Sequence, residues 1–493
     1  MILGTSSGSG KSITSAAICR ILKRRNKSPV PFKGQNMSNN AWVDRYGGEM
    51  AHSQAVQAWA SGIEPESSMN PILLKPMGDS KSEIIHLGKS VGISNAKNYY
   101  RDWFSPGWEA IKKGLKNLEK FDQKTLILEG AGSPVEINLM HRDLTNLRLA
   151  KYLSAKCILV ADIERGGVFA QIIGTLELLN DEERKLIKGI IINRFRGDDS
   201  LFKSGIQWIE TKTNIPVLGI IPWLENYFPP EDSLDLLENK QANSNAELLL
   251  GIIKLPYLSN FSDFDPLFSE ESLKIEWINR NMSLKDFDGI IIPGSKQTIK
   301  DKNYLDKTGL SEEIIKFSRQ GGHILGICGG FQILGEKLYD PINLESNSLE
   351  NYSKEIKGLG LLPLETVYNC EKTKTKRDIL SNWPIKTRIN GFEVHHGMST
   401  LINNDGSIKP LFEDKKLGYI KNANNFINIV GTYMHGIFDD GRWRRSWINT
   451  LRRKKNLPLL SLNKQNYFEI KEKTIDTLAD AYEENLILKD LII

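Results

Sequence analysis

Near its N-terminus the chain carries the run Gly4-Thr5-Ser6-Ser7-Gly8-Ser9-Gly10-Lys11-Ser12. Small residues ahead of Gly-Lys-Ser let successive backbone N–H groups turn inward, as in loops that join a strand to a helix and cradle phosphate oxygens. In such a loop Lys11 neutralises the terminal phosphates, and the Ser12 hydroxyl ligates magnesium. We therefore expect ATP and Mg²⁺ to bind here, at the first strand-to-helix turn of an α/β domain.

The spacing of this loop departs from the commonest pattern, which has a glycine five positions before Gly10. This chain has Thr5 at that position and Gly4 one position earlier, a spacing that resembles the loop of dethiobiotin synthetase-like ligases. We expect the phosphates to contact Thr5, Gly8, Gly10, Lys11 and Ser12. Residues 1–3 are a short strand for such a loop, which usually follows about five strand residues. This indicates either a natural start upstream or an unusually short central strand.

Outward from the loop, short apolar runs alternate with segments of helix length. The runs are residues 125–128, 157–160, 189–192 and 216–220. Buried runs of this kind predict a parallel sheet covered by helices on both faces. We expect one of the intervening helices to be capped by Ser105, with Pro106 at its first position.

The length of 493 residues exceeds what one hydrophobic core supports, so we expect two domains. A polar stretch without periodicity separates the first α/β series from a second one, which includes the apolar runs 289–292 and 323–327. The predicted fold class is α/β, with two domains that are each a mainly parallel sheet flanked by helices. The expected parts are residues 1–236, a linker at 237–247, a second domain at 248–445 and C-terminal helices within 446–493.

Composition excludes several classes of protein. Hydrophobic residues make up 40% and charged residues 25% of the chain, as is typical of globular proteins. No apolar run approaches the ~18 to 20 residues of a membrane span, and the N-terminus carries no secretory leader pattern, so we expect a cytoplasmic protein. The net charge of +5 indicates no nucleic-acid partner. Four scattered cysteines predict neither disulfides nor a zinc site.

Two carboxylates are candidates for a second magnesium ligand. Glu129 directly follows the apolar run 125–128, and ligands of open α/β sheets gather at the carboxyl ends of strands. Glu49 is a second choice, and a surface-loop role is the alternative interpretation of each. Asn193 follows the run 189–192 and is a candidate for reading the adenine edge, although asparagine is also common in turns.

The second half of the chain predicts a nucleophilic cysteine. Residues 326–332 read Gly-Ile-Cys-Gly-Gly-Phe-Gln, directly after an apolar strand and before a helical stretch. A sharp strand-to-helix turn exposes Cys328, and the helix N-terminus favours its thiolate. His435 follows the apolar run 427–430 and is a candidate base. Gly294 and Ser295, again at the end of a strand, are candidates for donating N–H groups to an oxyanion.

Together these motifs resemble the cobyric acid synthase family over essentially the whole chain. Residues 326–332 match the nucleophile motif of class I glutamine amidotransferases, and residues 431–438 match the histidine segment of their cobalamin-type branch. Residues 293–298 resemble the oxyanion loop of that branch. Three further segments look like segments peculiar to cobyric acid synthases, namely 31–38, 161–169 and 192–198.

The resemblance implies a glutamine-hydrolysing carbon–nitrogen ligase. Its substrates would be glutamine, ATP and adenosylcobyrinic acid a,c-diamide, whose b, d, e and g carboxylates are amidated through acyl phosphates by ammonia released at Cys328. The two sites must then face one another. For glutamine and the oxyanion the resemblance implies Gly294, Ser295, Gly329, Gln332 and His395. For the corrin carboxylates it implies Lys33, Gln35, Asn36, Arg165, Arg194 and Arg196.

Two departures and two alternatives stay open at this point. Most class I amidotransferases have a glutamate two residues after the histidine, where this chain has Ile437, so the sequence does not tell what orients His435. Glu164 stands where the family resemblance predicts aspartate. The nearest alternative is the sister enzyme that amidates the a and c carboxylates, against which residues 33–38 argue. A ParA-type nucleotide switch with an idle second half is the other, and the intact Cys328 and His435 argue against it.

Overall fold

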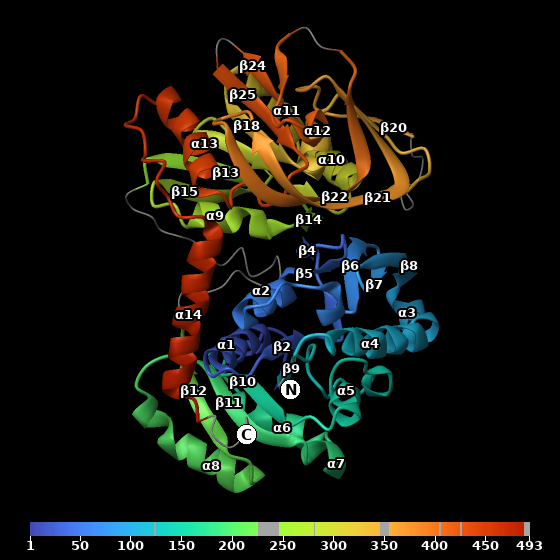
Figure 1. The fold of residues 1–493 in the computed structure, drawn as a ribbon, viewed down its shortest axis with the longest axis vertical. Helices are drawn as coiled ribbons and strands as arrows, with labels where there is room; N and C mark the ends of the chain where they lie inside the picture. Colours follow the sequence, from blue (N-terminus) through green and yellow to red (C-terminus); the bar gives the residue numbers. More distant parts are fainter. Residues whose placement is uncertain are drawn as a thin grey trace.

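The computed structural model describes residues 1–122, 125–224, 246–280, 282–345, 354–403, 406–423 and 426–487. The chain forms two α/β units, with the N-terminal unit below the second unit in Figure 1. The linker expected at 237–247 lies outside the described residues except for its last two. Within the described ranges, no helix is long and apolar enough to cross a membrane.

A parallel sheet forms the centre of the N-terminal unit, as the apolar runs predicted. Four strands have the order β1-β10-β11-β12. On the other side of β1, a parallel bridge between Ile2 and Glu129 adds β9, which in turn pairs with β2. The strands are β1 (Ile2–Gly4), β2 (Pro29–Phe32), β9 (Thr125–Leu128), β10 (Cys157–Asp162), β11 (Ile187–Phe195) and β12 (Val217–Pro222). The loop at Gly4 therefore leaves a central strand, although β1 has only three residues.

Helices cover both faces of this sheet. Successive side chains along a strand point to opposite faces, and here both sets are apolar, so each face must be buried under helices. Ile2 and Val160 belong to a core shared with α1, α2 and α4, whereas Leu3 and Leu159 belong to a core shared with α5, α6 and α8. These helices are α1 (Lys11–Arg24), α2 (His52–Ser61), α4 (Phe104–Leu118), α5 (Leu147–Tyr152), α6 (Val168–Glu177) and α8 (Lys203–Thr213). A four-residue helix, α7 (Asp181–Arg184), precedes β11.

The predicted cap of α4 was wrong. The helix begins at Phe104 with Trp103 at its N-cap, so Ser105 lies inside the first turn. The reason is the preceding helix α3 (Ala96–Asp102), which runs almost directly into α4 and makes the backbone helical before Ser105 is reached. Pro106 still lies in the first turn, where its missing N–H group is tolerated.

A group of short strands in the N-terminal unit was not predicted. They are β3 (Gln35–Met37), β4 (Ala41–Val43), β5 (Glu49–Ala51), β6 (Ile72–Gly78), β7 (Lys81–His86) and β8 (Lys89–Asn95). β4 pairs with β5, and the others form a sheet of order β3-β6-β7-β8. In Figure 1 these strands lie on the side of the N-terminal unit that faces the second unit. They therefore bring residues of the first half to the boundary between the units.

The second unit contains a seven-stranded sheet of order β15-β13-β16-β18-β25-β24-β23. Its first five strands are mutually parallel. β24 runs antiparallel to both of its neighbours, β25 and β23. The strands are β13 (Leu248–Ile253), β15 (Leu273–Ile278), β16 (Gly289–Ile292), β18 (His323–Ile327), β23 (Ile408–Pro410), β24 (Gly418–Ala423) and β25 (Phe426–Thr432). The mainly parallel sheet predicted for this half is confirmed.

Several elements surround that sheet. The helices are α9 (Asp265–Phe268), α10 (Thr298–Lys307), α11 (Leu310–Arg319), α12 (Gly329–Leu334) and α13 (Gly441–Lys454). A second sheet consists of β19 (Lys337–Tyr339), β20 (Glu355–Lys357), β21 (Leu364–Ser381) and β22 (Thr387–Leu401), and a small pair consists of β14 (Leu258–Ser259) and β17 (Gly294–Ser295). The β14–β17 pair lies where β16 ends, beside the start of α12.

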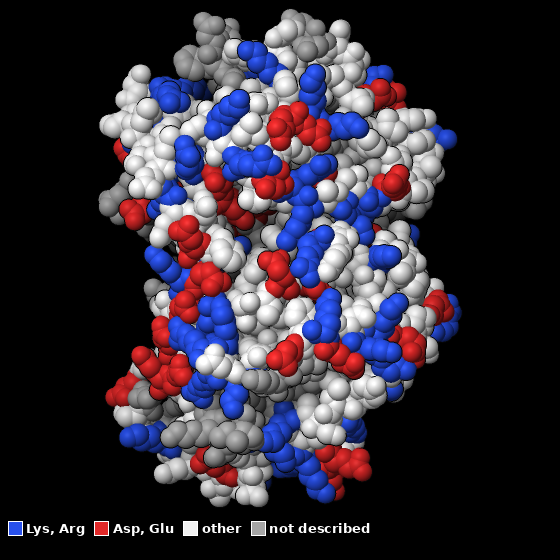
Figure 2. Space-filling view, in the orientation of Figure 1, with Lys and Arg blue, Asp and Glu red and all other residues white. Residues whose placement is uncertain are grey.

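The last helix returns to the first unit, which the sequence did not predict. α14 (Tyr467–Asn485) runs down the side of the N-terminal unit in Figure 1 and packs against α1 and β12. Buried Arg20 pairs with Glu472 at 2.8 Å, and Arg24 pairs with Asp476 at 2.8 Å. On the face shown in Figure 2, acidic and basic side chains are interspersed. The C-terminal segment thus joins the two units a second time.

Candidate active sites

The Gly4–Ser12 loop has the shape that phosphate binding requires. Gly10 has φ 99° at the N-cap of α1, a left-handed conformation that favours glycine. A Cβ atom on Gly4 would lie 2.2 Å from the Ser9 hydroxyl, so a larger residue there would displace the Ser9 and Lys11 side chains. The Lys11 ammonium donates to the Ser6 carbonyl at 2.9 Å and therefore lies along the loop, where the terminal phosphates are expected.

Two hydrogen bonds connect this loop to neighbouring elements. Asn193 donates its side-chain amide to the Ser9 carbonyl at 2.9 Å, and Thr5 donates its hydroxyl to Gln171 on α6 at 3.0 Å. Asn193 thus contacts the phosphate loop. Its contact with adenine stays a prediction.

Glu129 lies beside Ser12, as its place at the end of β9 predicted. The Ser12 hydroxyl donates to Glu129 Oε1 at 2.7 Å, and the Lys33 ammonium contacts the same oxygen at 2.7 Å. Gln54 and Gln57 of α2 donate to the other oxygen, Oε2, at 3.3 and 2.5 Å. The carboxylate is completely buried. It is therefore held from four sides at the carboxyl edge of the sheet.

This arrangement fits magnesium. A serine hydroxyl and a carboxylate are the hard oxygen ligands that Mg²⁺ prefers, and the ion commonly takes its remaining ligands from phosphate and water. Among the described residues, no three His, Cys, Asp or Glu side chains gather into a cluster that would hold a metal ion by themselves. Ser12 and Glu129 are thus close enough to share an ion, and their binding of magnesium stays a prediction.

The other carboxylate candidate, Glu49, is used elsewhere. It lies on β5 and pairs with Lys75 at 3.0 Å and with Lys372 of the second unit at 2.6 Å. Burial by itself raises the pKa of Glu49, but Lys372 and Lys75 outweigh burial and lower it to about 2. We correct the expectation of a metal ligand here, because β5 directs this carboxylate to lysines at the boundary between the units.

The residues expected to contact the corrin are dispersed. Lys33 faces Glu129 with only 4% of its side chain exposed, so it belongs to the nucleotide end. Asn36 donates to Gln54 on α2 at 2.9 Å. The three arginine candidates lie farther along the sheet edge, near the ends of β10 and β11. Arg165 is exposed, and Arg194 pairs with Asp162. Arg196 pairs with Glu164 and stacks on Trp223. The structure does not bring these six residues together.

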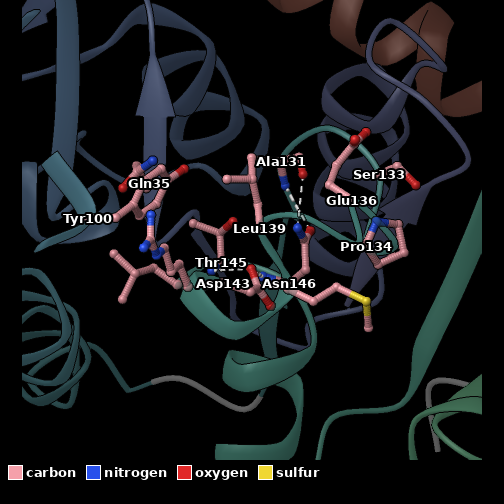
Figure 3. A pocket seen from close by; sticks show the side chains of 13 residues that line it. Gln35, Tyr100, Ala131, Ser133, Pro134, Glu136, Leu139, Asp143, Thr145 and Asn146 are labelled. Atoms are coloured by element: carbon pink, nitrogen blue, oxygen red, sulfur yellow. Dashed lines mark hydrogen bonds between the residues drawn. The ribbon is translucent and has the colours of Figure 1, made fainter. Parts of the chain in front are cut away.

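Gln35 does line a pocket, shown in Figure 3. Ala131, two residues after Glu129 in the chain, is one of the residues that line this pocket. The pocket therefore lies close to the Glu129 end of the nucleotide site. The Asn146 side chain, which also lines the pocket, accepts a hydrogen bond from the Ala131 N–H group at 3.0 Å and donates one to the Ala131 carbonyl at 2.9 Å. Arg142 lies over the ring of Tyr100 at 5.9 Å. The sequence missed Arg142 and Tyr100, which belong to no motif that we recognised.

In the second unit, Cys328 lies on a sharp turn between β18 and α12. Its backbone has φ 50° and ψ −106°, a strained conformation for a residue with a side chain. The glycines after it are required sterically. A Cβ atom on Gly329 would lie 2.8 Å from the Ser295 nitrogen, and one on Gly330 would lie 2.0 Å from the Ile292 carbonyl oxygen. The predicted turn is present, but the expectation that it exposes the cysteine was wrong, because Cys328 is only 5% exposed and packs into the core of the second unit.

His435 and Asp263 form a buried pair. His435 Nδ1 lies 2.7 Å from Asp263 Oδ2, and the Gly436 N–H group donates to Asp263 Oδ1 at 2.8 Å. Burial by itself lowers the pKa of His435. The negative charge of Asp263 and the hydrogen bond with the Cys328 sulfur outweigh burial and raise it to about 10. The His435 ring is therefore held between the Asp263 carboxylate and the Cys328 sulfur.

Asp263 is the orienting group that the sequence did not reveal. It takes the part that a glutamate plays in most class I enzymes, but it lies 172 residues before the histidine. The one available signal was position, since Asp263 follows β13 at the carboxyl edge of the second sheet. A short helical turn, Phe261–Phe264, carries it.

The predicted oxyanion loop lies against the same pair. A Cβ atom on Gly294 would lie 3.2 Å from His435 Cε1, and the Ser295 N–H group faces Gly329. The Ser295 hydroxyl donates to Asp301 at 2.5 Å. Burial raises the pKa of Asp301 to about 7 against the lowering effect of that hydrogen bond. Gly294, Ser295 and Gly329 therefore surround the nucleophile.

The two remaining candidates are held in a buried network behind the thiol. Gln332 accepts from the Tyr368 hydroxyl at 2.9 Å and donates to the Tyr433 hydroxyl at 3.3 Å. His395 stacks on the Tyr433 ring, with centroids 3.7 Å apart, and contacts Glu393 at 3.0 Å. Both side chains support the site from behind. Direct contact with glutamine stays a prediction for each.

Comparison with protein families defines the class. Residues 1–233 match the family model described as the CobQ/CobB/MinD/ParA nucleotide binding domain, and residues 250–443 match the CobB/CobQ-like glutamine amidotransferase domain. Together with the two sites, these matches make the chain a glutamine amidotransferase joined to a nucleotide-binding domain, which is the construction of a glutamine-hydrolysing ligase.

Full-length relatives define the family. The chain is 58% identical over 494 residues to the cobyric acid synthase of Prochlorococcus marinus strain SARG and 59% identical over 495 residues to that of strain MIT 9312. Each alignment covers all of this chain and 97% of the relative. The chain belongs to the cobyric acid synthase family. A solved glutamine amidotransferase structure is similar over 38% of this chain and 89% of its own, at 13% identity and a TM-score of 0.29.

Proposed function

We propose that this chain amidates the b, d, e and g carboxylates of adenosylcobyrinic acid a,c-diamide to give adenosylcobyric acid, with ATP and glutamine consumed at each carboxylate. The observation that carries the proposal is the full-length identity of 58–59% to cobyric acid synthases. The geometry supports it, because a Cys328–His435–Asp263 site and a Ser12–Glu129 site occur in one chain. We expect the enzyme to work in the cytoplasm.

Glutamine hydrolysis follows from the geometry of the second unit. The Cys328 thiolate attacks the carbonyl carbon of the glutamine amide, and N–H groups of the Gly294–Ser295 loop and Gly329 stabilise the oxyanion. The His435 imidazolium gives its proton to the departing nitrogen, so ammonia leaves and a thioester remains. Neutral His435 then takes a proton from water, the hydroxide attacks the thioester, and glutamate is released with the thiolate restored.

Carboxylate activation takes place in the first unit. The loop N–H groups and Lys11 hold the ATP phosphates while the terminal phosphoryl group moves to an acceptor carboxylate, giving an acyl phosphate and ADP. Ammonia then attacks the acyl carbon and phosphate leaves. Ser12 and Glu129 would hold magnesium, which neutralises charge between the phosphates when bound. The pocket lined by Gln35 and Ala131 is a candidate space for the acceptor carboxylate.

Mass analysis of the corrin product tests the proposal and separates it from the nearest alternative, cobyrinic acid a,c-diamide synthase. The protein is incubated with adenosylcobyrinic acid a,c-diamide, ATP, magnesium and glutamine. We expect four successive carboxylate-to-amide mass changes. A protein that leaves the a,c-diamide unchanged but converts cobyrinic acid into it would be the sister enzyme, and the proposal would be wrong.

A further inference from the structure

A short segment of the first unit reaches into the amidotransferase site. We define the clamp as residues 39–43, which include β4 and lie directly below the second unit in Figure 1. Asn260 of the second unit donates its backbone N–H group to the Asn39 carbonyl at 3.2 Å and its side-chain amide to the Ala41 carbonyl at 3.0 Å. The Ser262 hydroxyl donates to the Asn40 side-chain oxygen at 2.9 Å. Three hydrogen bonds thus connect the clamp to residues 260–262.

Those bonds hold the turn that carries the orienting carboxylate. Asn260 has φ 51°, in the left-handed region that asparagine adopts more readily than most residues, and its hydrogen bonds to the clamp fix this conformation. Its carbonyl accepts from the Asp263 N–H group at 3.1 Å. Asn40 and Asn260 are both almost fully buried, at 4% and 2% exposed, so water does not compete for their hydrogen bonds. The direction of Asp263 toward His435 therefore depends on contacts made by the first unit.

The clamp also supports the histidine through Trp42. The Trp42 ring lies edge-on to Phe392, with centroids 5.1 Å apart, and Phe392 stacks on the His435 ring at 5.2 Å. The backbones of Phe392 and His435 exchange two N–H···O bonds, at 3.2 and 2.8 Å. Val43 packs into the same apolar cluster as Phe392 and Val394. One ring of the first unit therefore limits the position of the catalytic base.

The clamp is itself fixed to helix α2 of the first unit. The His52 N–H group at the start of α2 donates to the Asn40 carbonyl at 3.0 Å, and the Trp42 ring packs edge-on against Trp59 of α2 at 5.1 Å. The same helix presents Gln54 and Gln57 to Glu129 at the nucleotide site. Helix α2 therefore contacts both the clamp and Glu129, which gives the clamp a defined position relative to the nucleotide site.

We propose that Asn40 and Trp42 of the first unit are positioning residues for glutamine hydrolysis, acting through Asp263 and His435. The amidotransferase site is thus complete only when the first unit is docked on it. This inference rests on the proposed function for its substrates, but the hydrolysis of glutamine can be measured separately from corrin amidation.

The test compares two nitrogen donors in the full-length enzyme. Asn40→Ala and Trp42→Leu are assayed for corrin amidation with glutamine and with ammonium salt, and for glutamate release. We expect the glutamine-dependent rate and glutamate release to fall about tenfold, because displacement of a catalytic group by less than 1 Å has large effects on rate. The ammonia-dependent rate should stay within about twofold of the parent, since that reaction does not use His435.

Matched controls separate positioning from general damage. Trp208→Leu removes another tryptophan of the first unit, which lies half-exposed on α8 and packs on Phe169, and it should change neither rate. Ser262→Ala combined with Asn40→Ala should lose no more than either single change, because both remove one hydrogen bond. The basic limb of the pH profile for glutamate release should move to lower pH in both clamp variants. Asn40→Ala displaces Asp263 and Trp42→Leu displaces the His435 ring, and either change weakens the contact by which Asp263 raises the pKa of His435.

Three results would overturn the inference: equal losses with both nitrogen donors, no loss with either clamp variant, or an unchanged pH profile in slower variants. If the parent releases glutamate but never amidates the corrin, the proposed function fails. The clamp is then still judged by glutamate release alone.

Discussion

The two strand-to-helix turns of this protein share an architecture and differ in the residue that occupies the left-handed position. In the first turn Gly10 has φ 99°, and a wide loop of small residues leaves backbone N–H groups for phosphate. In the second, Cys328 has φ 50°, and the turn is so tight that Gly329 and Gly330 touch the neighbouring strand. The width of each turn therefore matches its expected role: the wide first turn leaves room for an anion, and the tight second turn holds one side chain in a fixed position.

The most severe way to break the second turn is Cys328→Ser. We expect glutamine-dependent amidation to be abolished while ammonia-dependent amidation continues, because only amide hydrolysis needs the thiolate. The measurement is product formation with each nitrogen donor. Cys370→Ser, at an exposed cysteine, is the control and should match the parent. Loss of the ammonia-dependent reaction in Cys328→Ser would contradict the division of work between the turns.

The corresponding break in the first turn is Lys11→Ala. Lys11 lies along the phosphate loop, so its loss should reduce ATP cleavage to background with either nitrogen donor. ADP release is the measurement, and glutamate release without ATP should persist. Lys27→Ala, at an exposed lysine just after α1, serves as the control. Substantial ATP cleavage by Lys11→Ala would remove the loop from the mechanism.

Asp263→Asn sharpens the account of the second turn. The charge of Asp263 raises the pKa of His435 to about 10 against burial, which lowers it. Without that charge burial dominates, the pKa falls, and the basic limb of glutamate release moves to lower pH. We expect the rate to fall roughly 10²- to 10⁴-fold, as when other triads lose the orienting carboxylate. An unchanged limb would mean that another group sets the protonation of His435.

The smallest expected effect is on stability, at the boundary that lets the two turns work together. Glu83 on β7 contacts Lys296, next to Ser295, at 2.5 Å and Lys372 at 3.3 Å, with only 5% of its side chain exposed. Glu83→Gln leaves buried ammonium groups short of countercharge, and we expect a loss of about 3 kcal/mol in the free energy of unfolding.

Denaturant unfolding measures that loss, and a surface pair provides the comparison. Glu276→Gln breaks the partly exposed pair with Lys274 and should cost less than about 1 kcal/mol. Equal costs for the two changes would show that the charge cluster between the units contributes no more than a surface pair.

The local shapes predicted from the sequence agree with the structure at the two turns. The phosphate loop and the cysteine turn are each contiguous, because a strand, a turn of small residues and a helix N-terminus follow one another in the chain. Glu129 was also predictable, since the carboxyl ends of parallel strands meet at one edge. Glu49 was misassigned because its lysine partners come from β6 and from β21, and no local pattern indicates such a pairing.

The sequence by itself therefore determined the fold class and the family, and it located the loop at Gly4–Ser12 and the turn at Cys328, whose chemical roles stay predictions. Only the tertiary structure decided that Asp263 orients His435, that Lys33 faces Glu129, that α14 packs on α1, and that residues 39–43 support the other unit. The physical reason is sequence distance. Local conformation follows from neighbouring residues, whereas a buried charge or amide finds its partner only after distant strands and helices have packed together.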